Sequence, residues 1–248
     1  RGALSQHYTD SNEFGHTYFM EFAKTSGKFL FEISHTIESD TYDPNDMGYI
    51  RNNNESSWNL ELEYDIKEPF WKVLNWSNRL SFRYTSLYKP REYTDFEIRY
   101  RTNTTFSKSY VHLGFFAEVK PFKRYDYFEP RVDGWKLELP RNGIANIWLS
   151  TDYRKKLAGN LRFGSWTSFD DDQYGYWYSI GPRLRFSDKW LLTYSFDVNN
   201  RYNSFGYVES FKNVDDDVII HMGNRDQSTY TNTLNTSYIF NNKASLSF

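Results

Sequence analysis

The chain has 248 residues, a formal net charge of −2 and no cysteine. The lack of cysteine excludes a disulfide framework and a thiolate metal site, and the near-neutral charge gives no electrostatic sign of nucleic-acid binding. Hydrophobic residues make up 39% of the chain and aromatic residues 20%, whereas ordinary globular domains are about 45–50% apolar. The apolar surface is therefore concentrated in rings, and the mean hydropathy is −0.78.

Apolar residues recur at every second position along nearly the whole chain. This period of two is typical of strands with one apolar and one polar face. No useful stretch has a helical period, and no apolar run reaches the roughly 18 residues of a membrane-spanning helix. In chain order we predict strands at 16–25, 28–38, 57–66, 76–87, 94–103, 110–120, 144–154, 158–167, 175–186, 190–199 and 227–240, with a further one beginning at 244.

The connections between these strands alternate between two classes. The mostly short class comprises 26–27, 104–108, 155–157, 187–189 and 241–243, with 67–75 as a longer exception. The mostly long class comprises 39–56, 88–93, 121–143, 168–174 and 200–226. Outer-membrane β-barrels have short turns at one end and long loops at the other, so the alternation favours that architecture.

On the apolar faces, Trp or Tyr often marks the strand ends, and Leu, Ile or Phe occupies the middle. This order is expected for a lipid-facing band between two interfacial aromatic girdles. We predict that the lipid-facing residues include Trp58, Leu60, Leu62, Tyr64, Leu80, Phe82, Leu113, Phe115, Trp190, Leu192 and Tyr194.

The opposite faces of the same strands are polar and charged. The candidate lumen charges are Glu61, Glu63, Asp65, Arg79, Arg83, Arg99, Arg101, Arg183 and Arg185. Side chains on neighbouring antiparallel strands lie within salt-bridge reach. These charges therefore either filter and orient a solute, or form a structural ion-pair ladder along the wall.

Volume decides which face points inward. A closed barrel of eleven or more strands is too wide for its own side chains to fill, and the soluble eleven-stranded can needs a central helix that is not predicted here. We therefore expect an all-β, up-and-down antiparallel transmembrane β-barrel of at least 12 strands, with its rings outward. A soluble β-sandwich or propeller explains the alternation equally well, but neither the ring-rich strand ends nor the two classes of connection.

Aromatic residues in the long connections are the candidate binding residues: Tyr125, Tyr127, Trp135, Tyr202 and Phe205. Such rings either stack on sugars or anchor a partner, or they pack within loops that fold over the mouth. The acidic triplets 170–172 and 215–217 also lie in long connections, but neither matches a calcium-binding loop. We therefore predict no metal and no cofactor.

Two segments carry a family resemblance: 43–49, "DPNDMGY", and 215–248, "DDDVIIHMGNRDQSTYTNTLNTSYIFNNKASLSF". Both resemble the C-terminal barrel domain of a Bacteroidota outer-membrane family, whose members usually carry an N-terminal carbohydrate-binding module of the family-9 type. Between the two segments the resemblance is mainly one of strand pattern. It implies that residues 1–248 are part of the barrel, without the N-terminal module and the final strands, and it brings no catalytic motif.

Two functions are compatible with these features. The first is transport or surface binding of a solute, such as a glycan, at the bacterial outer membrane; the alternative is a non-conducting structural subunit of a larger outer-membrane complex. The expected partners are the lipid bilayer and other outer-membrane proteins or a glycan, and not nucleic acid. We expect no enzyme activity, because a hydrolase needs a His beside a Ser or Asp, and neither His35 nor His112 has a compelling partner in the sequence.

Overall fold

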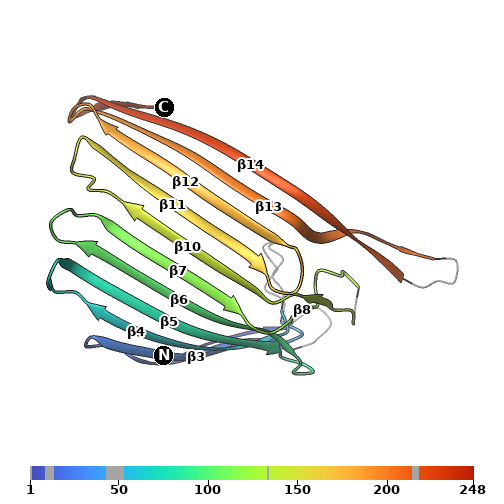
Figure 1. Ribbon diagram of the computed structural model, residues 1–248. Helices are drawn as coiled ribbons and strands as arrows, with labels where there is room; N and C mark the ends of the chain where they lie inside the picture. The colour runs from blue at the N-terminus through green and yellow to red at the C-terminus, as the bar shows by residue number, and fades with distance from the viewer. Residues whose placement is uncertain (1, 9–13, 43–52, 133, 214–217) are drawn as a thin grey trace.

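The computed structural model describes residues 2–8, 14–42, 53–132, 134–213 and 218–248. They form an all-β fold whose main feature is a 13-stranded antiparallel sheet (Figure 1). The described residues include no helix that is long and apolar enough to cross a membrane. The strands are β1 (Gly2–Tyr8), β2 (Phe14–Lys24), β3 (Phe29–Glu38), β4 (Glu55–Ile66), β5 (Val73–Leu87), β6 (Tyr93–Phe106), β7 (His112–Lys120), β8 (Arg124–Asp126), β9 (Leu137–Leu139), β10 (Asn142–Ser150), β11 (Leu157–Ser168), β12 (Tyr174–Arg185), β13 (Trp190–Lys212), β14 (Val218–Asn241) and β15 (Ala244–Ser247).

The sheet has an up-and-down topology, as predicted. Each strand pairs with its neighbours in the chain, except that β7 pairs with β10 because β8 and β9 form a separate two-stranded sheet between them. The longest connections, 39–54 and 121–141, lie at one end of the sheet (Figure 1), but 88–92 and 169–173 at the same end are no longer than the turns 107–111 and 151–156 at the other end. The predicted antiparallel sheet is therefore confirmed, and the alternation of short and long connections is confirmed only in part.

Three features differ from the predicted strands. β1 was not predicted, and β8 and β9 lie inside the expected connection 121–143. The expected long connection 200–226 is wrong, because β13 continues to Lys212 and β14 already begins at Val218. A register shift between Arg201 and Ser204 explains this error, since an irregular residue reverses which side chains face which side and so interrupts the period of two.

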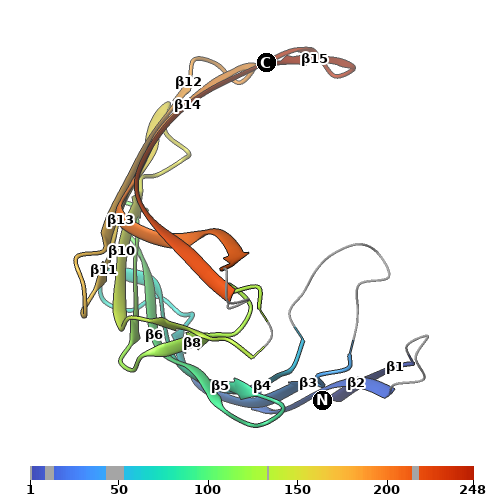
Figure 2. The ribbon, with the colours of Figure 1, turned by 90° about the vertical axis from the view of Figure 1, so that its right-hand side faces the viewer.

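The sheet curves into an open trough (Figure 2). Its edge strands are β1 and β15, which do not pair with each other, so the described residues do not close into a barrel. At its free edge, β14 pairs with β15 and Phe248 only between Thr236 and Asn241. Most of this 24-residue strand therefore presents unpaired backbone groups, which form a template for another strand.

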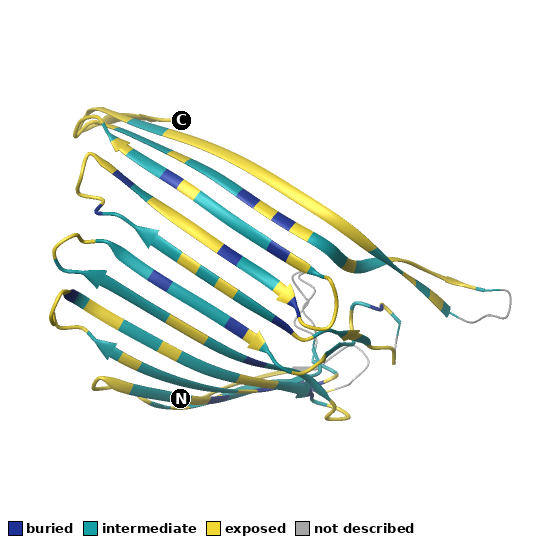
Figure 3. Ribbon diagram, in the orientation of Figure 1, coloured by how far each residue is buried: buried dark blue, intermediate teal, exposed yellow. Residues whose placement is uncertain are grey.

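The convex face of the trough is apolar and uncovered. Rows of rings and aliphatic side chains cross it in register, such as Trp58–Tyr84–Phe96 and Leu62–Leu80–Tyr100. Figure 3 shows how few positions are buried, and the buried hydrophobic residues of the described chain are Val73, Leu87, Ala158 and Val198. The fold therefore has almost no hydrophobic core of its own.

The accessible surface gives a magnitude for this exposure. It is 16800 Å², whereas a soluble monomer of 29.8 kDa exposes about 11,600 Å² by the usual scaling with mass. The excess of about 5,000 Å² shows how open the sheet is on both faces. On the convex face this exposed area includes large apolar side chains such as Trp58, Ile147 and Leu161.

Polar atoms on the convex face are paired with one another. The indole nitrogens of Trp76 and Trp190 donate to the hydroxyls of Thr102 (3.0 Å) and Thr236 (3.1 Å) on the neighbouring strand. Likewise the Tyr100 hydroxyl donates to Asn78 Oδ1 at 2.9 Å, and the Tyr194 hydroxyl to Asn232 Oδ1 at 2.6 Å. Such internal pairing is what a polar group needs when no water is available to it.

On the concave face, two tryptophans lie flat over glycines of the adjacent strand. A Cβ atom added to Gly114 would lie 2.1 Å from the Trp148 ring, and one added to Gly164 would lie 2.3 Å from the Trp177 ring. In both cases the glycine and the tryptophan are direct cross-strand partners. Only a residue without a side chain leaves room for the ring against the sheet.

This contact gives the first prediction. We expect Gly164→Ala to lower the free energy of unfolding by about 1–3 kcal/mol, because the new methyl group must displace the Trp177 ring. Gly206→Ala is the matched control, since a Cβ atom at Gly206 meets nothing within 4 Å. Urea-unfolding midpoints measure both changes, and equal midpoints for the two variants would contradict the tight contact.

Candidate functional site

The best candidate for a functional site lies on the concave face, at the end of the sheet that carries the long connections. The β8–β9 hairpin and the extension of β13 and β14 both reach over this end (Figures 1 and 2). They touch each other, because Tyr207 N donates to Glu129 Oε1 at 3.2 Å and the Arg131 guanidinium lies 4.4 Å from the Tyr207 ring centre. Two neighbouring cavities lie beneath them, of about 360 and 410 Å³, and both are lined by Arg124 and Leu139.

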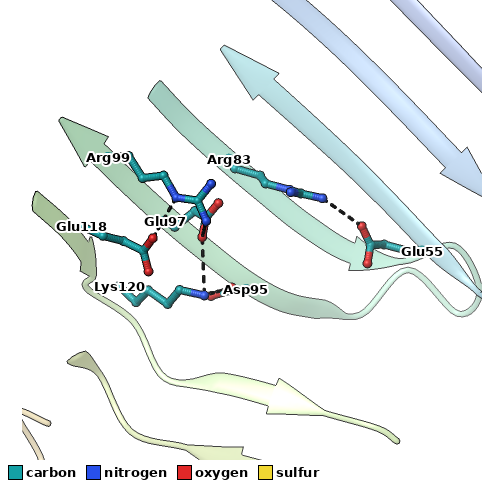
Figure 4. A network of polar contacts seen from close by, with 7 residues as sticks. All are labelled: Glu55, Arg83, Asp95, Glu97, Arg99, Glu118 and Lys120. Carbon is teal, nitrogen blue, oxygen red and sulfur yellow. Dashed lines mark hydrogen bonds and ion pairs between the residues drawn. The ribbon is translucent and has the colours of Figure 1, made fainter. Parts of the chain in front are cut away.

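The first cavity is charged. Its lining includes the acids Glu55, Asp95 and Glu97, together with the bases Arg83, Arg99 and Lys120. Figure 4 shows these side chains with Glu118, all projecting from strands β4–β7. The cavity therefore lies where the predicted charged face of the sheet meets its mouth.

Arg99 and Lys120 neutralise most of the acids of this cavity. Arg99 donates to both Glu97 and Glu118, each at 2.8 Å, and Lys120 forms ion pairs with Asp95 and, at 3.5 Å, with Glu97 (Figure 4). Glu97 is only 5% exposed and Glu118 only 8%, so each needs its cation. This cluster therefore has the properties of a structural ion-pair ladder, one of the two interpretations open from the sequence.

The other predicted lumen charges have varied partners. Arg79 bridges Glu61 (3.1 Å) and Glu63 (2.9 Å), and Asp65 lies 4.0 Å from Lys67. The remaining arginines do not pair with a carboxylate directly across the strand. Arg83 forms an ion pair with Glu55, Arg101 lies over the Trp148 ring, and Arg183 donates to the Tyr153 carbonyl. Arg185 lies on the same face, opposite Leu191 of β13.

The second cavity is aromatic and basic. Trp166 and Trp177 form its rings, with Ile144 beside them, and Arg124 and Arg201 supply two positive charges. Asn199 and Gln173 add amide groups, and the lining contains no carboxylate. This cavity can therefore stack a flat ligand face and hold negative charge.

The hairpin is fastened to the sheet by a small cluster. Lys136 Nζ lies 3.3 Å from Glu92 and sits over the rings of Tyr125 (4.6 Å) and Tyr127 (5.7 Å). The Tyr127 hydroxyl also donates to Glu92. The pKa of Glu92 therefore lies below its usual range, because its carboxylate accepts hydrogen bonds from Tyr127, which has the larger effect, and from Lys136.

The predicted ring-bearing loop residues lie in different surroundings. Tyr125 belongs to β8, and Tyr202 and Phe205 belong to β13, so their assignment to loops is wrong. Tyr202 stacks on Tyr174 with ring centres 4.8 Å apart. Trp135 is in an irregular segment and is 46% exposed, and only Tyr125 and Tyr127 line a cavity.

The sequence interpretation missed the residues of the aromatic cavity. Trp166 and Trp177, and also Trp148, occupy the polar phase of their strands, where rings were not expected. A usable signal was present: the residues two positions before and after each of these tryptophans are Gly, Asn or Ser, so each tryptophan shares its face with small and polar residues and not with the apolar residues of its strand. Arg124 and Arg201 gave no such signal.

The remaining candidates show no reactive arrangement. Asp170 forms an ion pair with Arg141 at 2.6 Å, which lowers the pKa of that carboxyl, and the triplet 215–217 and the segment 43–49 lie outside the described residues. His112 contacts the Thr105 hydroxyl at 3.2 Å, and His35 stacks on Trp58. Across the described ranges, no group of three or more His, Cys, Asp or Glu is placed to hold a metal.

The ion-pair cluster gives the second prediction. We expect Arg99→Met to destabilise the protein by about 1–3 kcal/mol, because it leaves the buried Glu97 and Glu118 short of a donor. Arg83→Met is the matched control: Arg83 and its partner Glu55 are each 45% exposed, and such pairs contribute only about 0–1 kcal/mol. If the two variants unfold at the same urea concentration, the cluster has no structural role.

The fastening of the hairpin gives a prediction of pH dependence. A lowered pKa means that the Glu92 contacts are complete above the ordinary Glu value of about 4.3 and are lost as the pH falls through the lowered value. The protection factors for hydrogen exchange in residues 124–139, taken against the intrinsic rates at each pH, should therefore fall on acidification below about pH 4. Glu92→Gln should remove this step, whereas Glu138→Gln, which loses a pair within the hairpin, should keep it.

Comparison with known proteins places the chain in a family. No curated protein and no solved structure matches it. One family model, described as a domain of unknown function, DUF5916, matches residues 1–248. The match spans the whole 13-stranded sheet and the hairpin, and the chain therefore belongs to the DUF5916 family.

Proposed function

We propose that this chain forms the wall of a bacterial outer-membrane β-barrel, with its convex face in lipid and its concave face lining an aqueous passage. The passage serves the transport or surface binding of a solute. One observation carries the proposal: the apolar face of the sheet is uncovered, whereas the charged face is concave. In water, an uncovered apolar face of this size would be very costly in free energy.

A soluble sandwich is the competing architecture, and it needs a second apolar layer. Trp58 is 51% exposed, and Leu62, Phe82 and Leu192 are covered by no other layer of the described chain. The hydrogen bonds between Trp or Tyr tips and Thr or Asn on this face support a hydrocarbon environment, because polar groups on a wet face would bond to water instead.

The dimensions of the strands also support the proposal. A tilted transmembrane strand needs about 9–11 residues, and β2 to β7 have 9 to 15. The free edges of β1 and β14 would be joined by further strands in a closed barrel. We propose that the family resemblance to Bacteroidota outer-membrane barrels reflects this architecture.

A non-conducting structural subunit of an outer-membrane complex is the second candidate. It is favoured by the free edge of β14 and by the ion-paired cavity, both of which suit a wall that contacts a partner. We propose no enzymatic role, since His112 faces a threonine hydroxyl rather than an activated nucleophile. The aromatic cavity, which has no internal partner for its arginines, favours solute binding over a purely structural role.

Conductance distinguishes the two candidates. We expect the full-length protein, purified in detergent and added to planar lipid bilayers, to give discrete single-channel current steps. Membrane fractionation and native mass spectrometry of the same preparation provide the control for folding and for bound partners. A folded protein that inserts without conducting, and that co-purifies with stoichiometric partners, would overturn the transport proposal in favour of the structural one.

A further inference from the structure

We propose that the aromatic cavity and the tryptophans next to it form a binding track for an acidic oligosaccharide, a chain of sugar units that carries carboxylate or sulfate groups. The inference rests on the proposed function, because it requires the concave face to be wet. It adds the position of the site, the chemical class of the ligand and the residues that select it.

The tryptophans provide flat platforms. The Trp177 ring is pressed against the backbone of Gly164, and the Trp148 ring against Gly114, so one side of each indole packs on the sheet. The other side of Trp177 faces the aromatic cavity that it lines, whereas the Arg101 guanidinium lies over the Trp148 ring, 5.1 Å from its centre. A ring held in this way loses little conformational entropy when an apolar ligand face stacks on it.

The three rings follow one another along the sheet. Trp148 pairs with Gly114 and Arg162, Trp177 with Gly164 and Asn199, and Trp166 with Gly175 and Ile144. Because Asn146 pairs with Gly164 and Ile144 with Trp166, these pairs belong to three successive rows of the concave face. Rows two residues apart are separated by about 7 Å along the strands, and neighbouring strands by about 4.8 Å. Trp166 and Trp177 therefore lie one row and one strand apart in the aromatic cavity, and Trp148 lies one row further along, in the neighbouring cavity that Arg101 also lines.

Amide groups surround the platforms. Asn199 pairs directly with Trp177, and Gln173 lies in the lining of the same cavity. The Gln173 side-chain nitrogen donates to Asp171 at 2.7 Å, which fixes the amide at the rim. Rings beside amide groups match the two surfaces of a sugar, whose C–H face is apolar and whose edge carries hydroxyls.

The arginines select for negative charge. Among the residues that the structure describes, neither Arg124 nor Arg201 has an acidic partner within 4.0 Å, in contrast to the paired bases of the charged cavity. Arg124 Nε itself is buried without a hydrogen-bond partner, whereas Arg201 is exposed. A carboxylate or sulfate in the cavity would pair with the Arg201 guanidinium in the geometry that guanidinium groups favour.

The volume also fits a ligand of this size. At about 410 Å³ the cavity is within the range of about 300–1,000 Å³ typical of ligand sites. A neutral sugar would leave both guanidinium groups unpaired, and a small anion would leave the rings unused. An extended acidic glycan engages both features at once.

Current block in planar bilayers tests the site. The full-length protein is titrated with tri-galacturonate, which carries a carboxylate on each unit, and with maltotriose, a neutral trimer. We expect half-block by tri-galacturonate at a concentration at least tenfold lower than by maltotriose. Arg201→Gln and Trp166→Leu should each raise that concentration at least tenfold.

Matched variants control for charge and ring content. Arg83→Gln removes a concave-face arginine that is already paired with Glu55, and Trp58→Leu removes a ring from the convex face. Neither should change the block. Arg201 is exposed, so its substitution does not endanger folding and keeps the test valid if Trp166→Leu is poorly folded.

Calorimetry on the detergent-solubilised protein separates the two levels of the proposal. Normal conductance with no block and no heat of binding would overturn the glycan site and leave the passage intact. Binding of tri-galacturonate by a protein that never conducts would support the site and contradict the passage. Equal binding of the two trimers, or an unchanged affinity in Arg201→Gln, would overturn the selection of acidic sugars.

Discussion

An apolar sheet face that no other layer of the described chain covers is the constraint on which the rest of this structure depends. A soluble domain of this size hides its aliphatic and aromatic side chains in a core; here only four hydrophobic residues of the described ranges are buried. In the proposed arrangement the surroundings supply the apolar phase. The unusual composition follows, because one apolar face per strand suffices and the rest of the chain is free to be polar.

The properties of the concave face follow from the same constraint. Since the strands cannot be backed by a second layer, their inner side chains must be satisfied by water or by each other. Arg99 between Glu97 and Glu118 is satisfied internally, whereas Arg124 and Arg201 are not. Arg124 lines both cavities, and Arg201 lines only the aromatic one. The paired cluster around Arg99 maintains the wall, and in the proposed site the unpaired Arg201 is available to a ligand.

Much of the fold could be predicted from alternation alone, because a one-sided sheet imposes its period of two on the sequence. The pattern failed where that period is interrupted, at the register shift near Arg201, and where strands are very short, as in β8. The site was less predictable for a physical reason. Trp177 lies on the polar face of its strand, and its role becomes visible only when Gly164 is known to lie beneath its ring. Ion pairs such as Arg99–Glu118 depend on the register between neighbouring strands, which the sequence does not fix.

The central claim is that the convex face meets hydrocarbon, and cysteine labelling along β5 tests it most directly. Residues 1–248 contain no cysteine, so single cysteines at Leu80, Ser81 and Phe82 of the full-length protein can carry a fluorophore in liposomes. Lipids with a quencher on the acyl chain should quench the label at positions 80 and 82 and spare position 81, and a membrane-impermeant maleimide should react only at position 81. Equal quenching at all three positions, or ready reaction of positions 80 and 82 with the impermeant reagent, would contradict the account.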